Sequence, residues 1–136
     1  MCFYAYSPLA GGFLVKSPAI IKSGGVGRWD PTSYAGQLYH RLYNKKSMVE
    51  ALSEWEAIAT EFGVSKAALA YRWVEYNSTL SGSYGDGMII GATRPEQLEQ
   101  TLEAIKAGPL PDAAVKRIGK VWEMVKDEAP VDNYHG

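Results

Sequence analysis

Only two segments of this sequence have the composition of buried β-strands. Residues 3–6 are mostly aromatic and end at Ser7-Pro8, where proline stops a strand. Residues 88–90, Met-Ile-Ile, are apolar on both faces, which is typical of a strand in a parallel sheet covered by helices. Two strands rarely form a stable sheet in water. The sequence therefore predicts an α/β fold whose sheet needs further strands.

Apolar residues recur at helical spacing in four segments, residues 47–62, 65–77, 94–107 and 112–127. Ser47 with Glu50, and Thr93 with Glu96, have the spacing of a capping box, which predicts two of the helix starts. Gly63 predicts the end of the first of these helices. Residues 10–36 are rich in glycine and proline and predict a long loop, a feature that is uncommon unless it is functional or disordered.

The aromatic and acidic residues of these segments have simple structural interpretations. Three tryptophans lie at helical core spacing and predict packing: Trp55, Trp73 and Trp122. Trp29 lies in the long loop, where packing and ligand contact are both open. The glutamates at 50, 54, 56 and 61 predict a solvated helix face rather than paired catalytic carboxylates.

Composition excludes several classes of function. The 136 residues carry a formal net charge of −1, which argues against broad attraction to nucleic acid or to an anionic membrane. Cys2 stands alone and the two histidines, His40 and His135, lie far apart, so we expect no disulfide and no metal site. The sequence has no secretion signal and no apolar run that would span a bilayer, which predicts a cytoplasmic protein.

The boundaries of the chain carry two further expectations. The sequence begins within what looks like a buried strand, and a natural start usually has a polar lead-in, so we expect a truncated chain. We expect one domain over residues 1–129, followed by a loose tail over residues 130–136.

The turn at residues 90–94, Ile-Gly-Ala-Thr-Arg, is the most informative motif. It joins the second strand directly to a helix, whose first N–H groups and positive dipole end form a ready anion site. Gly91 allows a ligand to approach the backbone, and Arg94 offers bidentate contacts to a phosphate. Gln97 and Gln100 follow at spacings that place their amides over an adenosine. Taken alone, the turn is explained more simply as an ordinary connection with a solvated arginine.

The loop after the first strand provides a second, weaker signal. Small residues at 10–12, Ala-Gly-Gly, would let a phosphate lie against backbone amides, although a simple turn explains them better when they are taken alone. In a (β/α)₈ barrel, phosphate groups often bind the loops after strands seven and eight, near a helix N-terminus. Because both predicted strands are followed by glycine-bearing loops, the pair together favours nucleotide binding.

These motifs resemble a known family. Residues 3–12, FYAYSPLAGG, are similar to the seventh-strand segment of the aldo-keto reductases, and residues 89–100, IIGATRPEQLEQ, resemble their eighth strand and following helix. Residues 27–29, 69–73, 84–87 and 103–111 are most similar to the aflatoxin-aldehyde reductase branch. The resemblance implies the C-terminal portion of a (β/α)₈ TIM barrel: its last two strands and about four helices, an incomplete barrel.

The resemblance also implies the site residues and the cofactor, NADP(H). Arg28 would reach over the cofactor as part of a belt, and Tyr39 matches a substrate-side tyrosine. Leu42 stands where some members have an arginine, with Arg41 as a weak substitute, and the tail lacks the terminal arginine of this branch. The remaining cofactor-binding residues that the resemblance implies are Ser7, Pro8, Leu9, Ala10, Gly11, Gly12, Leu14, Gly91, Ala92, Thr93, Arg94, Gln97 and Gln100.

The chemistry of the family uses an aspartate, a tyrosine, a lysine and a histidine on earlier strands, and no segment here matches those motifs. Tyr4 and Tyr6 fit better as strand residues than as proton donors. We therefore assign no catalytic residue. The resemblance implies NADPH-dependent reduction of aldehydes or ketones, with this chain supplying the cofactor-binding part and with a homodimer as the assembly of a complete barrel. The alternative is an inactive remnant or a non-enzymatic module that binds a nucleotide or a partner.

Overall fold

The computed structural model describes residues 1–132, which divide into two compact units. The first unit consists of Met1–Val15 and Ala59–Lys116, and the second of Lys16–Ile58 and the chain from Arg117 onward. Two helices, α3 (Lys46–Glu61) and α6 (Asp112–Val125), run from one unit into the other. The predicted tail, residues 130–136, lies outside the described residues from 133 onward.

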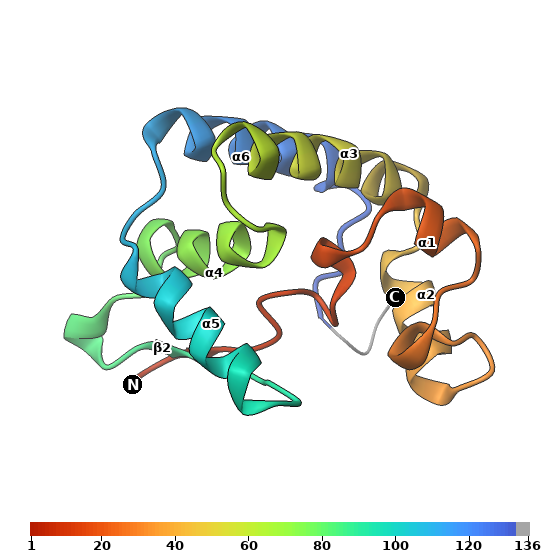
Figure 1. Ribbon diagram of the computed structural model, residues 1–136, viewed down its shortest axis with the longest axis horizontal. Helices are drawn as coiled ribbons and strands as arrows, with labels where there is room; N and C mark the ends of the chain where they lie inside the picture. The colour runs from red at the N-terminus through yellow and green to blue at the C-terminus, as the bar shows by residue number, and fades with distance from the viewer. Residues whose placement is uncertain (133–136) are drawn as a thin grey trace. The chain divides into compact units, whose positions relative to one another are not determined.

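The first unit contains a parallel pair of short strands, β1 (Tyr4–Ala5) and β2 (Gly87–Met88). Tyr4 pairs with Gly87 and Ala5 with Met88, and Figure 1 shows the red N-terminal segment running beside β2. The carboxylate of Asp86 accepts hydrogen bonds from the N–H groups of Phe3 (2.8 Å) and Ser81 (3.0 Å). These bonds lower the pKa of Asp86, with the bond from Phe3 as the larger cause. Asp86 thus ties the first strand to the loop before the second.

The prediction that both strands are buried is wrong for the described chain. The exposed fraction is 57% for Tyr4, 56% for Tyr6 and 55% for Ile89. The second strand also ends earlier than predicted, at Met88 rather than at residue 90. The physical reason is that the sheet has only two strands here, so both outer edges and much of its surface lack a neighbour.

Three helical elements surround the pocket described below: η1 (Phe13–Val15), α4 (Lys66–Asn77) and α5 (Pro95–Lys106). Helix α4 packs against both η1 and α5. Its start was predicted correctly, because the Oγ of Ser65 accepts a hydrogen bond from the N–H of Ala68 at 3.0 Å. The side chains of Leu69 and Phe13 are among those buried in this unit. A short turn of helix, η3 (Gly82–Tyr84), leads to β2.

The second unit contains α1 (Pro18–Lys22), η2 (Gly27–Trp29) and α2 (Tyr34–Tyr43). The prediction of a structureless loop over residues 10–36 is therefore wrong: η1, α1, η2 and the start of α2 lie within it. Helix α2 begins after Ser33, whose Oγ accepts a hydrogen bond from the N–H of Gly36 at 3.0 Å. A glycine in the first turn lowers helix propensity and hides such a helix from a sequence pattern.

Trp29 lies in the core of the second unit, with an exposed fraction of 1%. Its ring stacks on Tyr39 at a centroid distance of 5.5 Å and meets His40 edge-on at 5.3 Å. The Nε2 atom of His40 lies 3.0 Å from the carbonyl oxygens of both Gly24 and Trp29. The packing explanation for Trp29 is therefore the one that fits the structure.

Both predicted capping boxes are replaced by other contacts. Ser47 lies inside α3, and its N–H (3.0 Å) and hydroxyl donate to the carboxylate of Glu128 rather than pairing with Glu50. The hydrogen bonds from Ser47 lower the pKa of Glu128. At the start of α5 the N-cap residue is Arg94, one residue later than predicted, and no side chain caps it. In both places the hydrogen-bond partner differs from the one that the spacing predicted. Ser47 pairs with Glu128, and Thr93 pairs with Gln97.

The helix-face predictions hold in part. Trp55 is buried as predicted, and Trp73 is partly buried, but Trp122 has an exposed fraction of 55%. The prediction is wrong for Trp122 because this residue lies at the edge of the more buried side of α6. That side consists of Ala114, Ile118, Val121 and Val125. Glu54 is not simply solvated, because its Oε1 accepts a hydrogen bond from the Nε of Arg117 at 2.9 Å.

Among residues 1–132, no helix is both long and apolar enough to cross a membrane.

Candidate cofactor pocket

The turn from the second strand into α5 is exposed and open. Residues 91–94 are all exposed, and a Cβ atom placed on Gly91 would meet no atom within 4 Å. The guanidinium of Arg94 has no hydrogen bond or ion pair to any of the described residues. The backbone, the positive end of the α5 dipole and a cation are thus presented at one place, which suits an anion.

Gln97 holds this turn in the present structure. Its Oε1 accepts a hydrogen bond from the hydroxyl of Thr93 at 2.8 Å and from the N–H of Thr93 at 3.2 Å. A backbone N–H at the helix start therefore already has an acceptor of the kind that a phosphate oxygen would provide.

The loop after β1 follows an unusual backbone path. Ser7 and Ala10 have φ angles of 53° and 51°, a left-handed conformation that is uncommon for residues with a side chain. Gly11 and Gly12 continue it with φ angles of 64° and 85°. The N–H of Gly12 donates to the carbonyl of Leu9 at 3.0 Å, and that of Ala10 to Ser7 at 2.8 Å. These two N–H groups already donate hydrogen bonds within the turn. A ligand would therefore contact the surface of the loop rather than these N–H groups.

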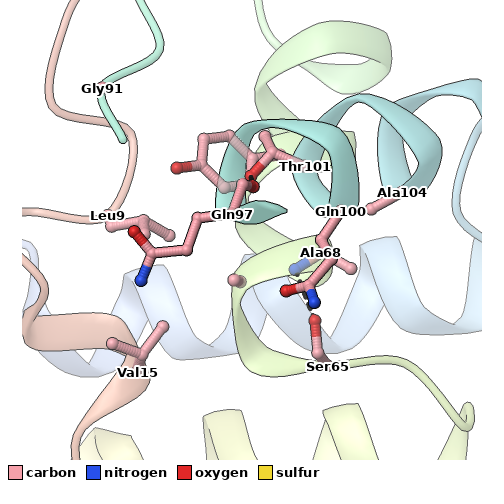
Figure 2. A pocket seen from close by; sticks show the side chains of 11 residues that line it. Leu9, Val15, Ser65, Ala68, Gly91, Gln97, Gln100, Thr101 and Ala104 are labelled. Atoms are coloured by element: carbon pink, nitrogen blue, oxygen red, sulfur yellow. Dashed lines mark hydrogen bonds between the residues drawn. The ribbon is translucent and has the colours of Figure 1, made fainter. Parts of the chain in front are cut away.

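A pocket of about 320 Å³ lies in the first unit, between this loop and the facing sides of α4 and α5. Figure 2 shows the side chain of Gln97 extending toward Leu9, and the carboxamide of Gln100 directed toward Ser65. The Oγ of Ser65 already accepts a hydrogen bond from the N–H of Ala68. The hydroxyl proton of Ser65 therefore remains available as a donor in the pocket. The lining residues are Leu9, Val15, Ser65, Ala67, Ala68, Tyr71, Gly91, Gln97, Gln100, Thr101 and Ala104.

The pocket brings together four residues that the sequence assigned to cofactor binding: Leu9, Gly91, Gln97 and Gln100. The remaining assigned residues of the first unit do not line the pocket: Ser7, Pro8, Ala10, Gly11, Gly12, Leu14, Ala92, Thr93 and Arg94. Arg28 and Tyr39 belong to the second unit, where Arg28 is exposed in η2 and Tyr39 stacks on Trp29. The roles of Arg28 and Tyr39 stay predictions.

The wall that α4 contributes was missed by sequence reasoning. The sequence predicted only a helix that starts at Ser65. Nothing local indicates which element is faced by the residues of this wall, Ser65, Ala67, Ala68 and Tyr71. A usable signal exists on α5, since Thr101 and Ala104 lie four residues after Gln97 and Gln100 and so share their face. Burial raises the pKa of Tyr71 above its ordinary value.

Comparisons with known proteins agree on one family. The profile described as "Aldo/keto reductase family" matches residues 1–123. The oxidoreductase sirO of Leptosphaeria maculans is 41% identical over 128 residues, which cover 94% of this chain and 39% of that protein. The human aflatoxin B1 aldehyde reductase member 2 is 37% identical over 135 residues (94% and 37%), and human member 4 is 36% identical over 135 residues (94% and 40%).

The chain thus spans about two fifths of the length of these relatives. The match extends over both units and includes both strand-loop segments that frame the pocket. On this evidence the chain belongs to the aldo/keto reductase family.

Proposed function

We propose that this chain forms the cofactor-binding part of an NADPH-dependent reductase that converts aldehydes or ketones to alcohols. The supporting observation is the pocket that joins Leu9, from the first strand-loop segment, to Gln97 and Gln100 on α5. Two glycine-bearing segments that are far apart in sequence meet there, next to an exposed arginine. Members of this family typically use NADP(H), and the pocket offers the donors and acceptors that the adenosine end of that cofactor needs.

The size of the pocket supports part of the cofactor rather than all of it. Ligand sites for drug-sized molecules occupy roughly 300–1,000 Å³, so a pocket of about 320 Å³ suits one half of a dinucleotide. The carboxamides of Gln97 and Gln100 provide donors and acceptors for adenine or ribose. Arg94 and the exposed backbone at residues 91–93 would take the 2′-phosphate, because a guanidinium binds phosphate through two parallel hydrogen bonds.

The roles of the chain's own residues are binding and orientation. When bound, the cofactor supplies a hydride to the carbonyl carbon of the substrate. We propose that Ser7, Leu9 and the glycines at 11 and 12 lie along the pyrophosphate, with Arg28 across the cofactor and Tyr39 on the substrate side. The proton donor of the family has no match in these residues, so turnover requires the segment that carries it.

The activity of the chain with and without that segment tests the proposal. With NADPH and 4-nitrobenzaldehyde, the chain alone should show no turnover, because it lacks the proton donor. A chimaera that joins the N-terminal part of human aflatoxin B1 aldehyde reductase member 2 to this chain should oxidise NADPH in the presence of the aldehyde. The measurement is the loss of nicotinamide absorbance.

Two results would contradict the proposal. Turnover by the chain alone, persisting through purification, would show that the proton donor lies within these residues. A chimaera that folds and binds NADPH without reducing the aldehyde would favour the alternative, a nucleotide-binding module without catalysis.

A further inference from the structure

His40 on α2 closes the loop that contains Arg28. Its Nε2 atom lies 3.0 Å from the carbonyl oxygen of Gly24 and 3.0 Å from that of Trp29, at the two ends of residues 24–29. Both carbonyl oxygens can only accept hydrogen bonds, so the ring nitrogen between them carries a proton. One imidazole N–H thus fastens both ends of the loop to the helix.

The second ring nitrogen of His40 has its own partner. Its Nδ1 atom lies 3.1 Å from the Nδ2 of Asn44, four residues further along the chain. In the neutral ring Nδ1 therefore accepts a hydrogen bond from Asn44, while Nε2 keeps its proton for the two carbonyls. The surroundings of His40 select this tautomer.

The loop itself is compact. Gly25 has a φ angle of 75°, and a Cβ atom at this position would lie 2.7 Å from the Cβ of Trp29. The side chain of Trp29 has an exposed fraction of 1% and meets the ring of His40 edge-on at 5.3 Å. Arg28 directly precedes this buried residue and is itself exposed. The backbone that carries the guanidinium is therefore held from below, by Trp29 and by His40.

The charges of this segment suit an anion. Residues 16–29 contain three basic side chains, Lys16, Lys22 and Arg28, and no aspartate or glutamate. The guanidinium of Arg28 forms no hydrogen bond or ion pair with the described residues. A guanidinium binds phosphate through a fork of N–H groups, which is effective only when its position is fixed closely.

We propose that His40 is a positioning residue for the cofactor: by holding the carbonyls of Gly24 and Trp29, it fixes where Arg28 presents its guanidinium to the phosphates of the dinucleotide. This inference rests on the proposed function, in which Arg28 lies across the cofactor. His40 does not contact the ligand in this arrangement, because both of its ring nitrogens have partners within the second unit.

Three variants separate the N–H group of His40 from its ring. His40→Phe keeps an aromatic ring beside Trp29 and removes the N–H. His40→Gln restores a donor, because the carboxamide nitrogen carries two protons at about the same reach from the backbone. Asn44→Ala is the matched control, since it removes the partner of Nδ1 and leaves the N–H that holds the loop.

The experiment measures NADP⁺ binding and amide hydrogen exchange for the 136-residue chain and these variants. His40→Phe should raise the Kd for NADP⁺ about 3- to 10-fold, whereas His40→Gln and Asn44→Ala should leave it within about 2-fold. Exchange at residues 24–30 should rise in His40→Phe alone, and exchange in α3 should stay unchanged. In an Arg28→Ala background, His40→Phe should change the Kd by less than about 2-fold, because both substitutions remove the same contact.

The outcomes separate this inference from the proposed function. Absence of NADP⁺ binding by the unsubstituted chain would contradict the proposed function, and with it the role of His40 toward the cofactor. The inference alone is overturned if the chain binds NADP⁺ and His40→Phe leaves the Kd unchanged, or if exchange rises equally across the second unit. It is also overturned if His40→Phe costs as much affinity in the Arg28→Ala background as in the wild type, since His40 would then not act through Arg28.

Discussion

Replacing Arg94 by alanine should weaken the binding of NADPH about 10- to 100-fold, the loss expected when charge-assisted hydrogen bonds to a phosphate are removed. The affinity for NADH should change by less than about 2-fold, because that cofactor has no 2′-phosphate. The difference between the two losses of affinity measures the contact between Arg94 and the 2′-phosphate. Arg94 is exposed, precedes the first turn of α5 and forms no hydrogen bond or ion pair with the described residues. Its removal should therefore cost binding and little stability.

Arg94→Lys serves as the control for charge alone. Lysine keeps the positive charge but cannot donate the two parallel hydrogen bonds of a guanidinium. The affinity of Arg94→Lys for NADPH should therefore lie between that of the wild type and that of the alanine variant. Titration of each variant with NADPH and with NADH in one buffer gives the comparison. Equal losses for the two cofactors in Arg94→Ala would show that this side chain does not bind the 2′-phosphate.

The largest effect on stability should come from Gly36→Ala, in the first turn of α2. A Cβ atom at this position would lie 1.8 Å from the carbonyl oxygen of Asp30 and 3.0 Å from the Oγ of Ser33. That carbonyl cannot easily move, because it accepts hydrogen bonds from the N–H (3.0 Å) and the hydroxyl (2.8 Å) of Ser33. We expect a loss of about 3 kcal/mol or more in the free energy of unfolding, the upper end of the range for overpacking.

Gly119→Ala is the matched control, a helix glycine in the same unit. No atom lies within 4 Å of a Cβ placed on Gly119, which is inside α6. Alanine should raise the free energy of unfolding there by about 0.5–1 kcal/mol, because it restricts the unfolded backbone and favours the helix. Urea unfolding followed by tryptophan fluorescence measures both variants. If Gly36→Ala were as stable as the wild type, the close approach between α2 and Asp30 would not exist in solution.

The sequence predicted the elements whose signals are local. The four longer helices after residue 45, and the cap of α4 by Ser65, follow from apolar spacing and capping residues. The parallel pairing of the two strands agrees with the barrel portion that the resemblance implied. Helix α2 was missed because Gly36, which must be small to approach Asp30, looks like a loop residue in a pattern.

The errors arise where a partner comes from elsewhere in the chain. Ser47 pairs with Glu128 instead of Glu50, a choice that no local spacing indicates. The α4 wall of the pocket depends on how α4 packs against α5, so Tyr71 was unrecognised as a site residue. Tyr4 and Ile89 look like buried strand residues, and they are exposed because this chain provides their sheet with only two strands. Local pattern thus locates elements, while packing decides which side chains meet.

The most direct test is to map the binding of 2′,5′-ADP, which reproduces the adenosine end of NADPH, onto the ¹⁵N-labelled chain by nuclear magnetic resonance. We expect saturable shifts of the amide signals of Gly91, Thr93, Gln97 and Gln100, and NADPH should shift the same amides, because these residues line or border the pocket. Saturation without shifts in residues 91–104, or no binding at all, would contradict the assignment of this pocket to the cofactor.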